Sequence, residues 1–214
     1  GHWRWWHASG ALERAVDFYE DRPHGTFKQF NNQGQKVTEG HYEHGEKKGE
    51  WKGYHPSGEV SYQGVFNSNH KEDGRWVSYH LNGQIANEGA YLNGDRVGLW
   101  RWFNLDRSLT QAGYYRNGTR EGIWISTYPN GNLRELGTYL QGERIDLWRW
   151  WSSDGTGMRA QKYHVDKPSR SLMAPAKLPE SQKIPAILKK LLRASTSTLK
   201  TESEKSNTVP ELWL

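Results

Sequence analysis

Cysteine is absent from the sequence, which excludes disulfide bonds and thiolate chemistry without fixing the redox compartment. Runs of about 18 consecutive apolar residues are also absent, so no segment is predicted to span a membrane as a helix. Aliphatic side chains are few, whereas the 214 residues include 12 Trp, 11 Tyr and 23 Gly. A core of this composition must consist largely of aromatic rings, and rings combined with glycine favour short strands and tight turns over a helical bundle.

Strong charge of one sign is lacking over most of the chain. Residues 1–167 contain 21 basic and 20 acidic side chains, whereas residues 168–214 contain 8 basic and 4 acidic ones. Most of the formal net charge of +5 therefore lies in the C-terminal part. Because a nucleic-acid-binding array needs a basic stripe along its length, we expect no nucleic acid as a partner.

An aromatic ring recurs every 24 residues, with one interval of 25. These rings, taken as position zero of each repeat, are Trp3, Phe27, Trp51, Trp76, Trp100, Trp124 and Trp148. A second aromatic column follows at position 15: Phe18, Tyr42, Phe66, Tyr91, Tyr115, Tyr139 and Tyr163. Repetition at a fixed period indicates that each copy is one supersecondary unit of a tandem array.

Glycine marks further columns of the repeat. At position 13 the five internal copies carry Gly40, Gly64, Gly89, Gly113 and Gly137. At position 18 glycine is replaced only by Asn or Asp, which also tolerate a positive φ: Asp21, Gly45, Asn69, Gly94, Gly118, Gly142 and Asp166. The pattern predicts a left-handed backbone there, and segments such as 129–131 (PNG) predict hairpin turns earlier in each copy.

Each copy is therefore predicted to form a strand, a tight turn, a second strand and a second turn. A lone hairpin is marginal in water, so the copies must bury their rings against one another. Glycine at position 13 is expected to let a ring of the neighbouring copy lie flat over bare backbone. We predict an all-β fold, a single-layer open antiparallel sheet of about seven tandem 24-residue β-hairpins over residues 1–167, on the order of 65 Å long.

The pattern G-x-W-x-x-Y-x-x-x-G, followed by G-x-Y-x-x-G-x-x-x-G, resembles the MORN repeat and, more closely, its bacterial variant. Segments 45–51 (GEKKGEW) and 94–100 (GDRVGLW) match it, and the resemblance extends over about residues 1–167. It implies a hairpin ribbon with a shallow groove that serves in protein–protein contact, sometimes dimerisation, and in phospholipid binding. Some bacterial members carry an antitoxin label. The resemblance implies no catalytic residues.

Three copies depart from the pattern. Copy one has Val16 at position 13, copy seven has Asp146 two residues before its ring and Gln161 at position 13, and copy three has one extra residue in its second turn, 69–73. Atypical terminal copies are expected of caps. For copy one truncation competes with capping, because the chain opens at a repeat landmark, Gly1, rather than at Met. We therefore expect a missing N-terminal part, which leaves the localisation open.

An extra ring two positions after the main ring is the first candidate binding feature. It occurs as Trp5, Trp102 and Trp150, each preceded by an arginine: Arg4, Arg101 and Arg149. Since alternate strand residues share a face, these rings are expected beside the main ring as a wider platform, with arginine alongside, for a peptide, a sugar face or a lipid headgroup. Local packing at the array's ends is the competing interpretation.

A basic column at position 20 is the second candidate: Lys47, Lys71, Arg96, Arg120 and Arg144. One cation per repeat along an edge suits a polyanion or an acidic membrane. Acidic residues are interleaved with the column, however, which is typical of a solvated rim that prevents strand aggregation. Both interpretations stay open.

Catalytic and metal-binding motifs are not recognisable. The nine histidines form no H-E-x-x-H pattern, only His41 and His44 lie within three positions of each other, and no phosphate loop or nucleophile–base set stands out. We expect no enzyme, no metal and no cofactor.

The C-terminal part divides into a linker at 168–183, a short amphipathic helix at 184–194 and a disordered tail at 195–214. In the helix, aliphatic residues fall on one face: Ile184, Ile187, Leu188, Leu191 and Leu192. Lys189, Lys190 and Arg193 lie on the other. Such a segment binds a membrane surface, or docks on the array or on a partner.

Three functions remain open. The first is a scaffold that binds a protein or peptide on its aromatic ribbon face. The second is a cell-surface or membrane-associated binder of glycan or phospholipid, using the tryptophan platforms and the basic tail helix. The third is an enzyme whose catalytic domain lies upstream of Gly1. We favour the first and allow for a homodimer.

Overall fold

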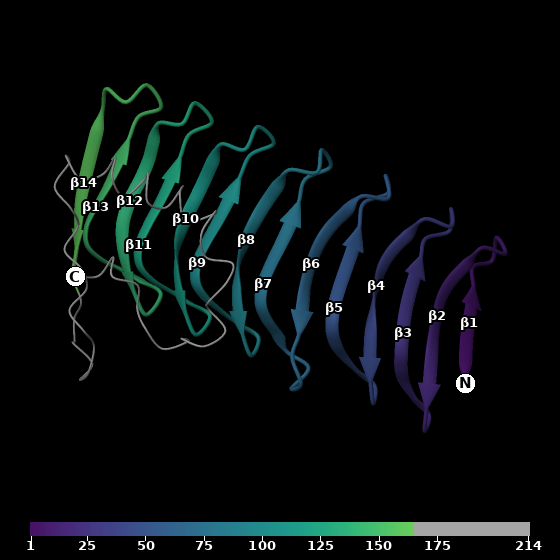
Figure 1. Ribbon diagram of the computed structural model, residues 1–214. Helices are drawn as coiled ribbons and strands as arrows, with labels where there is room; N and C mark the ends of the chain where they lie inside the picture. The colour runs from purple at the N-terminus through teal and green to yellow at the C-terminus, as the bar shows by residue number, and fades with distance from the viewer. Residues whose placement is uncertain (165–214) are drawn as a thin grey trace. The chain divides into compact units, whose positions relative to one another are not determined.

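The computed structural model describes residues 1–164. The predicted linker (168–183), amphipathic helix (184–194) and tail (195–214) lie outside the described residues. The described chain forms fourteen strands, two for each of the seven copies, and within it no helix is long and apolar enough to cross a membrane. The strands are labelled in chain order in Figure 1, and the chain divides into two compact units, unit 1 up to Arg107 and unit 2 from Ser108.

Unit 1 is an open antiparallel sheet in which each strand pairs with the next along the chain. Its strands are β1 (His2–Trp6), β2 (Leu12–Tyr19), β3 (Arg22–Phe30), β4 (Lys36–Glu43), β5 (Glu46–Tyr54), β6 (Val60–Phe66), β7 (Glu72–Tyr79), β8 (Ile85–Leu92) and β9 (Asp95–Phe103). Unit 2 repeats the arrangement with β10 (Leu109–Arg116), β11 (Thr119–Thr127), β12 (Leu133–Leu140), β13 (Glu143–Trp151) and β14 (Met158–Tyr163). The predicted all-β antiparallel fold is confirmed.

The ladder tryptophans of each unit pack directly on the backbone of strand glycines. A Cβ atom added to Gly113 would come within 2.1 Å of the Trp124 ring, and Gly40, Gly64, Gly89 and Gly137 are covered in the same way by the next position-zero indole. The indole nitrogen of Trp124 also donates a hydrogen bond of 3.0 Å to the carbonyl of Tyr114, the residue after its glycine. The predicted packing of a ring over position 13 is confirmed, because no side chain other than hydrogen fits beneath the ring.

Rings of the two aromatic columns alternate edge to face along each sheet. In unit 1 the centroids of Tyr42 and Trp51 are 5.2 Å apart at an interplanar angle of 86°. In unit 2 Tyr139 and Trp148 are 5.0 Å apart at 80°. We call the face that bears these rings the ladder face and the opposite one the back face. Trp51, Trp100, Trp124 and Trp148 are 1–3% exposed, so the ladder is the core of a one-layer protein.

Two kinds of turn close the hairpins. The second turns place two consecutive residues in the left-handed region, as at Asn93 (φ 52°) and Gly94 (φ 90°), which suits the twist of the flanking strands. The prediction for position 18 is wrong at Asn69. The extra residue of copy three moves the positive φ to His70 (φ 60°), and the Asn67 amide bonds the Lys71 carbonyl as in a first turn.

Side chains at the turn edge join one copy to the next. The Nε2 atom of His55 lies 2.9 Å from the Tyr79 carbonyl, and that of His80 lies 2.9 Å from the Phe103 carbonyl. Because a carbonyl oxygen only accepts, each Nε2 must carry the proton. These histidines, which offered no motif in the sequence, are structural links between repeats.

A methyl group under an indole tests the ladder. We expect Gly89→Ala to lower the free energy of unfolding by about 3 kcal/mol, because its Cβ would lie 2.1 Å from the Trp100 ring and the ring must move off the sheet. Urea denaturation followed by tryptophan fluorescence measures the change. Ser61→Ala, a strand substitution away from the ladder, should change it by less than about 0.5 kcal/mol. A loss below about 1 kcal/mol in Gly89→Ala would contradict the packing.

The last described turn holds a carboxylate with a low pKa. The Ser152 hydroxyl and the Thr156 amide and hydroxyl all donate to Asp154, which lowers the pKa of that carboxyl to about 2. The ionised Asp154 carboxylate therefore stabilises the folded chain. This stabilisation is complete above the ordinary pKa of 3.8 and is lost as pH falls through about 2. NMR titration should show the pKa rising in Ser152→Ala, where the first donor is removed, and staying low in Ser153→Ala.

Candidate functional site

The three extra tryptophans lie on the ladder face beside the main rings, as the alternation of strand residues predicts. Ring centroids are 6.2 Å apart for Trp3 and Trp5, 6.0 Å for Trp100 and Trp102, and 6.1 Å for Trp148 and Trp150. Trp5, Trp102 and Trp150 are half-buried, and each extends the aromatic surface toward the first turn.

The neighbouring arginines do not stand alongside these rings. Arg4, Arg101 and Arg149 occupy the alternate strand position and therefore lie on the back face. Arg101 is 7% exposed and bonds Glu88 at 2.6 Å, and Arg75 bonds the other oxygen of that carboxylate at 2.7 Å. The prediction that each arginine stands alongside the ring that follows it is therefore wrong. Neighbouring residues on a strand point to opposite faces of the sheet.

Other cations cover the ladder. Four members of the position-20 column lie over the next main ring, at 4.3–4.6 Å from its centroid: Lys47 over Trp51, Arg96 over Trp100, Arg120 over Trp124 and Arg144 over Trp148. They reach it because each pairs across the strands with a position-15 ring, as Tyr139 pairs with Arg144. The charges are held on indole faces. The contacts therefore favour neither a row of free cations for binding a polyanion nor an edge fully exposed to solvent.

Lys71 is the exception in this column. In the register of β6 and β7 the residue opposite Phe66 is Glu72, so an acid occupies the place that a cation takes in copies two, four, five and six. The extra residue of the turn displaces Lys71 by one position, where it is exposed. The equivalent of the other cations is therefore the residue four positions before Trp76, and not the residue twenty positions after Trp51.

Charged groups of both signs surround Trp150. Its indole nitrogen lies 3.2 Å from a Glu135 carboxylate oxygen, and the guanidinium groups of Arg159 and Arg144 lie 4.8 and 5.7 Å from its ring centroid. At the other end of the chain, Arg14 lies 4.3 Å over the Trp5 ring. Glu135, Arg159 and Arg14 lie at ladder-face positions of the adjacent strand, and none of them was predicted from the sequence.

Tyr62 is a further platform ring that the sequence reading missed. It lies across the backbone of Gly53, where an added Cβ would be 2.0 Å from the tyrosine ring, and it stacks on Trp76 at 6.3 Å and 14°. The available signal was Gly53 itself: glycine at position 2 of copy three leaves room for a ring from the paired strand.

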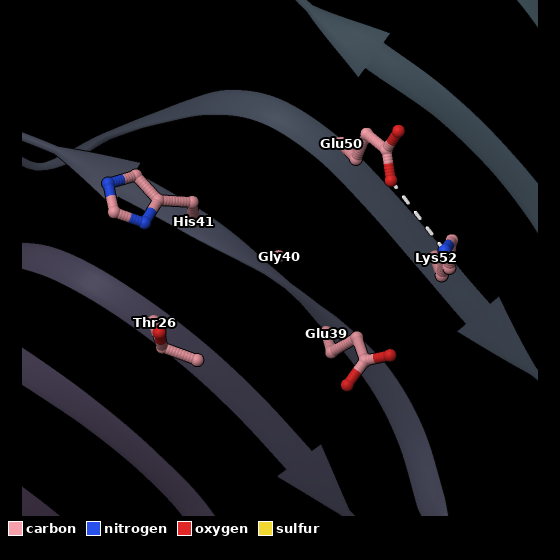
Figure 2. A pocket seen from close by; sticks show the side chains of 6 residues that line it. All are labelled: Thr26, Glu39, Gly40, His41, Glu50 and Lys52. Atoms are coloured by element: carbon pink, nitrogen blue, oxygen red, sulfur yellow. Dashed lines mark ion pairs between the residues drawn. The ribbon is translucent and has the colours of Figure 1, made fainter.

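A shallow hollow of about 330 Å³ lies on the back face of unit 1 (Figure 2). Its lining comes from three adjacent strands: Thr26 of β3, Glu39, Gly40 and His41 of β4, and Glu50 and Lys52 of β5. Lys52 and Glu50 form an ion pair at 3.6 Å. The hollow is polar, and among residues 1–164 no group of three or more His, Asp or Glu side chains is placed to hold a metal ion.

Glu39 belongs to a hydrogen-bonded cluster at the edge of this hollow. The Tyr54 hydroxyl donates to its carboxylate and the Lys36 ammonium lies 2.9 Å away, also 4.6 Å over the Tyr54 ring. The Tyr54 bond, followed by Lys36, holds the pKa of Glu39 below its usual range. A carboxylate held ionised in this way is a fixed charge and a poor general base at neutral pH.

Taken together, the geometry defines the class: a tandem β-hairpin repeat protein with an aromatic ladder and no recognisable catalytic group among the described residues. Three segments, 47–68, 72–93 and 120–141, match the family described as MORN repeat variant. Each begins four residues before a ladder tryptophan, at Lys47, Glu72 and Arg120, which agrees with the structural register. The three matches are consistent with a MORN repeat protein.

No curated protein matches the chain as a relative. MORN repeats are commonly modules that bind proteins or membrane lipids. The family and the all-β repeat fold are typically non-catalytic.

Removal of one hydroxyl tests the cluster around Glu39. We expect Tyr54→Phe to raise the pKa of Glu39, measured by NMR titration of its carboxyl carbon, because the largest lowering contribution is lost. The lowered pKa stabilises the fold above about pH 4.5, and this stabilisation fades as pH falls. Tyr42→Phe alters a ladder-face ring and should leave the Glu39 titration unchanged. A Glu39 titration insensitive to Tyr54→Phe would disprove the hydrogen bond.

Proposed function

We propose that the chain is a non-catalytic module that binds a protein or peptide segment on its ladder face, at the platforms of Trp5, Trp102 and Trp150. The observation that carries the proposal is the difference between the two sets of rings. The position-zero indoles are buried over glycine and needed for folding. The position-two rings occur in only three copies and lie half-buried beside them, with no glycine beneath.

The charges around the platforms favour a polypeptide over an acidic membrane. Arg144 and Arg159 flank Trp150, but Glu135 lies within hydrogen-bond distance of the same indole. An acidic membrane presents a net negative charge, whereas a peptide offers apolar groups, both charges and backbone donors and acceptors. Half-buried tryptophan with arginine beside it is the composition of energetic centres in protein interfaces.

Ring deletions test this proposal. A phage-displayed linear peptide library selected on the wild-type chain yields peptides whose Kd is then measured by fluorescence polarisation. We expect Trp150→Ala or Trp102→Ala to weaken binding about 30-fold, as removal of a central aromatic anchor does at interfaces. Trp6→Ala is the matched control, because Trp6 is a tryptophan 58% exposed at position three rather than at a platform. Its loss should change Kd less than about twofold.

Glycan arrays and phosphatidylcholine vesicles containing phosphatidylserine form the other arms of the test. If Trp102→Ala and Trp150→Ala leave peptide binding intact while abolishing glycan or vesicle binding, the platforms serve the alternative function and the proposal fails.

A further inference from the structure

Unit 2 has an apolar back face, unlike most of unit 1. Across β10, β11 and β12, Ile125 pairs with Ala112 on one side and Leu136 on the other. A parallel row across β11, β12 and β13 places Thr138 between Ile123 and Ile145. We call these six residues the back patch: Ala112, Ile123, Ile125, Leu136, Thr138 and Ile145.

The corresponding positions in copies two and three are polar. Lys28, Glu39 and Lys52 pair with one another across β3, β4 and β5, at the repeat positions of Ile125 and Leu136. A one-layer sheet keeps its solvent face polar, so the change to isoleucine and leucine marks a face that meets another surface. The back patch differs from the ladder face, since Trp124 and Ile125 are neighbours on one strand and point opposite ways.

Burial agrees with this composition. Ala112, Ile125, Leu136 and Thr138 are 0–1% exposed although they lie on the face opposite the aromatic core. Two polar atoms are buried with them and have no hydrogen-bond partner among residues 1–164: the Thr138 hydroxyl and Nη1 of Arg149, which pairs with Leu136 at the margin of the patch. Water would satisfy both atoms on an open face.

We propose that the chain's own segment 184–194 docks as an amphipathic helix on the back patch, with Ile184, Ile187, Leu188, Leu191 and Leu192 against the sheet. The sequence of this segment carries its apolar residues at the spacing of one helical face, and Lys189, Lys190 and Arg193 on the other. About ten residues are too few for a stable isolated helix, so the segment needs a surface to fold against.

The reach of the chain fits this occupant. Strand β14 ends at Tyr163, and β11 is three strands away, roughly 15 Å at the usual spacing. The residues 165–183 that separate the helix from the sheet span up to about 60 Å when extended. Docking on the same chain is therefore free of geometric strain and far more concentrated than docking of a second molecule.

Cysteine accessibility tests the proposal in the full chain, because the protein has no thiol of its own. Ile125→Cys supplies a single thiol in the back patch, and its labelling rate with a maleimide reports whether the patch is covered. We expect Leu188→Asp/Leu191→Asp to speed labelling about tenfold or more, since a tenfold change corresponds to only about 1.4 kcal/mol of docking free energy. Lys189→Ser/Lys190→Ser, on the opposite helical face, should leave the rate unchanged.

Two controls keep the outcome decisive. Val65→Cys, 40% exposed on the back face of unit 1, should label at the same rate in all backgrounds. Leu136→Cys replaces Ile125→Cys if the latter lowers the thermal midpoint. Equal labelling of the patch thiol with and without the Asp substitutions overturns the proposal. So does faster labelling only upon addition of vesicles containing phosphatidylserine, which would place the segment on a membrane instead.

Discussion

The packing of an indole on glycine backbone is the interaction on which the rest of this structure depends. A one-layer sheet has no second layer to bury its side chains, so each copy must cover the rings of the next. Glycine in a strand costs about 0.5–1 kcal/mol relative to alanine. Burying an aromatic side chain contributes about 1.5–3 kcal/mol, so the exchange favours glycine wherever a ring lies on it. With Trp148 only 1% exposed above Gly137, the repeat period is the spacing at which this contact recurs.

This requirement separates the two faces into different roles. The ladder face is largely committed to folding, because its tryptophans are buried and its cations lie on their rings. Under the proposed function, recognition on that face falls to the second row of rings, which only three copies carry, as Trp5, Trp102 and Trp150. The back face carries no folding requirement of the same kind, so Glu39 in unit 1 and Leu136 in unit 2 occupy equivalent positions. Their chemistry is free to differ because neither position lies under a ladder ring.

The sequence was informative wherever backbone geometry or ring packing imposes one residue type. The ring columns, the glycines under the indoles and the regular turns were predictable, because Gly113 or Gly94 admits few substitutes, whereas the longer turn of copy three was not. The candidate site was less predictable, since it depends on which face a side chain takes and which strand lies opposite. Arg101 was expected beside Trp102 and instead bonds Glu88 on the back face. Tyr62 was overlooked because its partner, Gly53, is a cross-strand neighbour.

Copy three shows how far the turns are independent of the ladder. Its extra residue converts the second turn to the geometry of a first turn and moves the positive φ to His70. It also puts Glu72 where four other copies have a cation. Yet Phe66 and Trp76 remain 5.4 Å apart at 87°, much as Tyr91 and Trp100 do at 5.1 Å and 85°. Since the core contact survives a change in turn length, turn residues are free to diverge, whereas the ladder rings and the glycines beneath them are not.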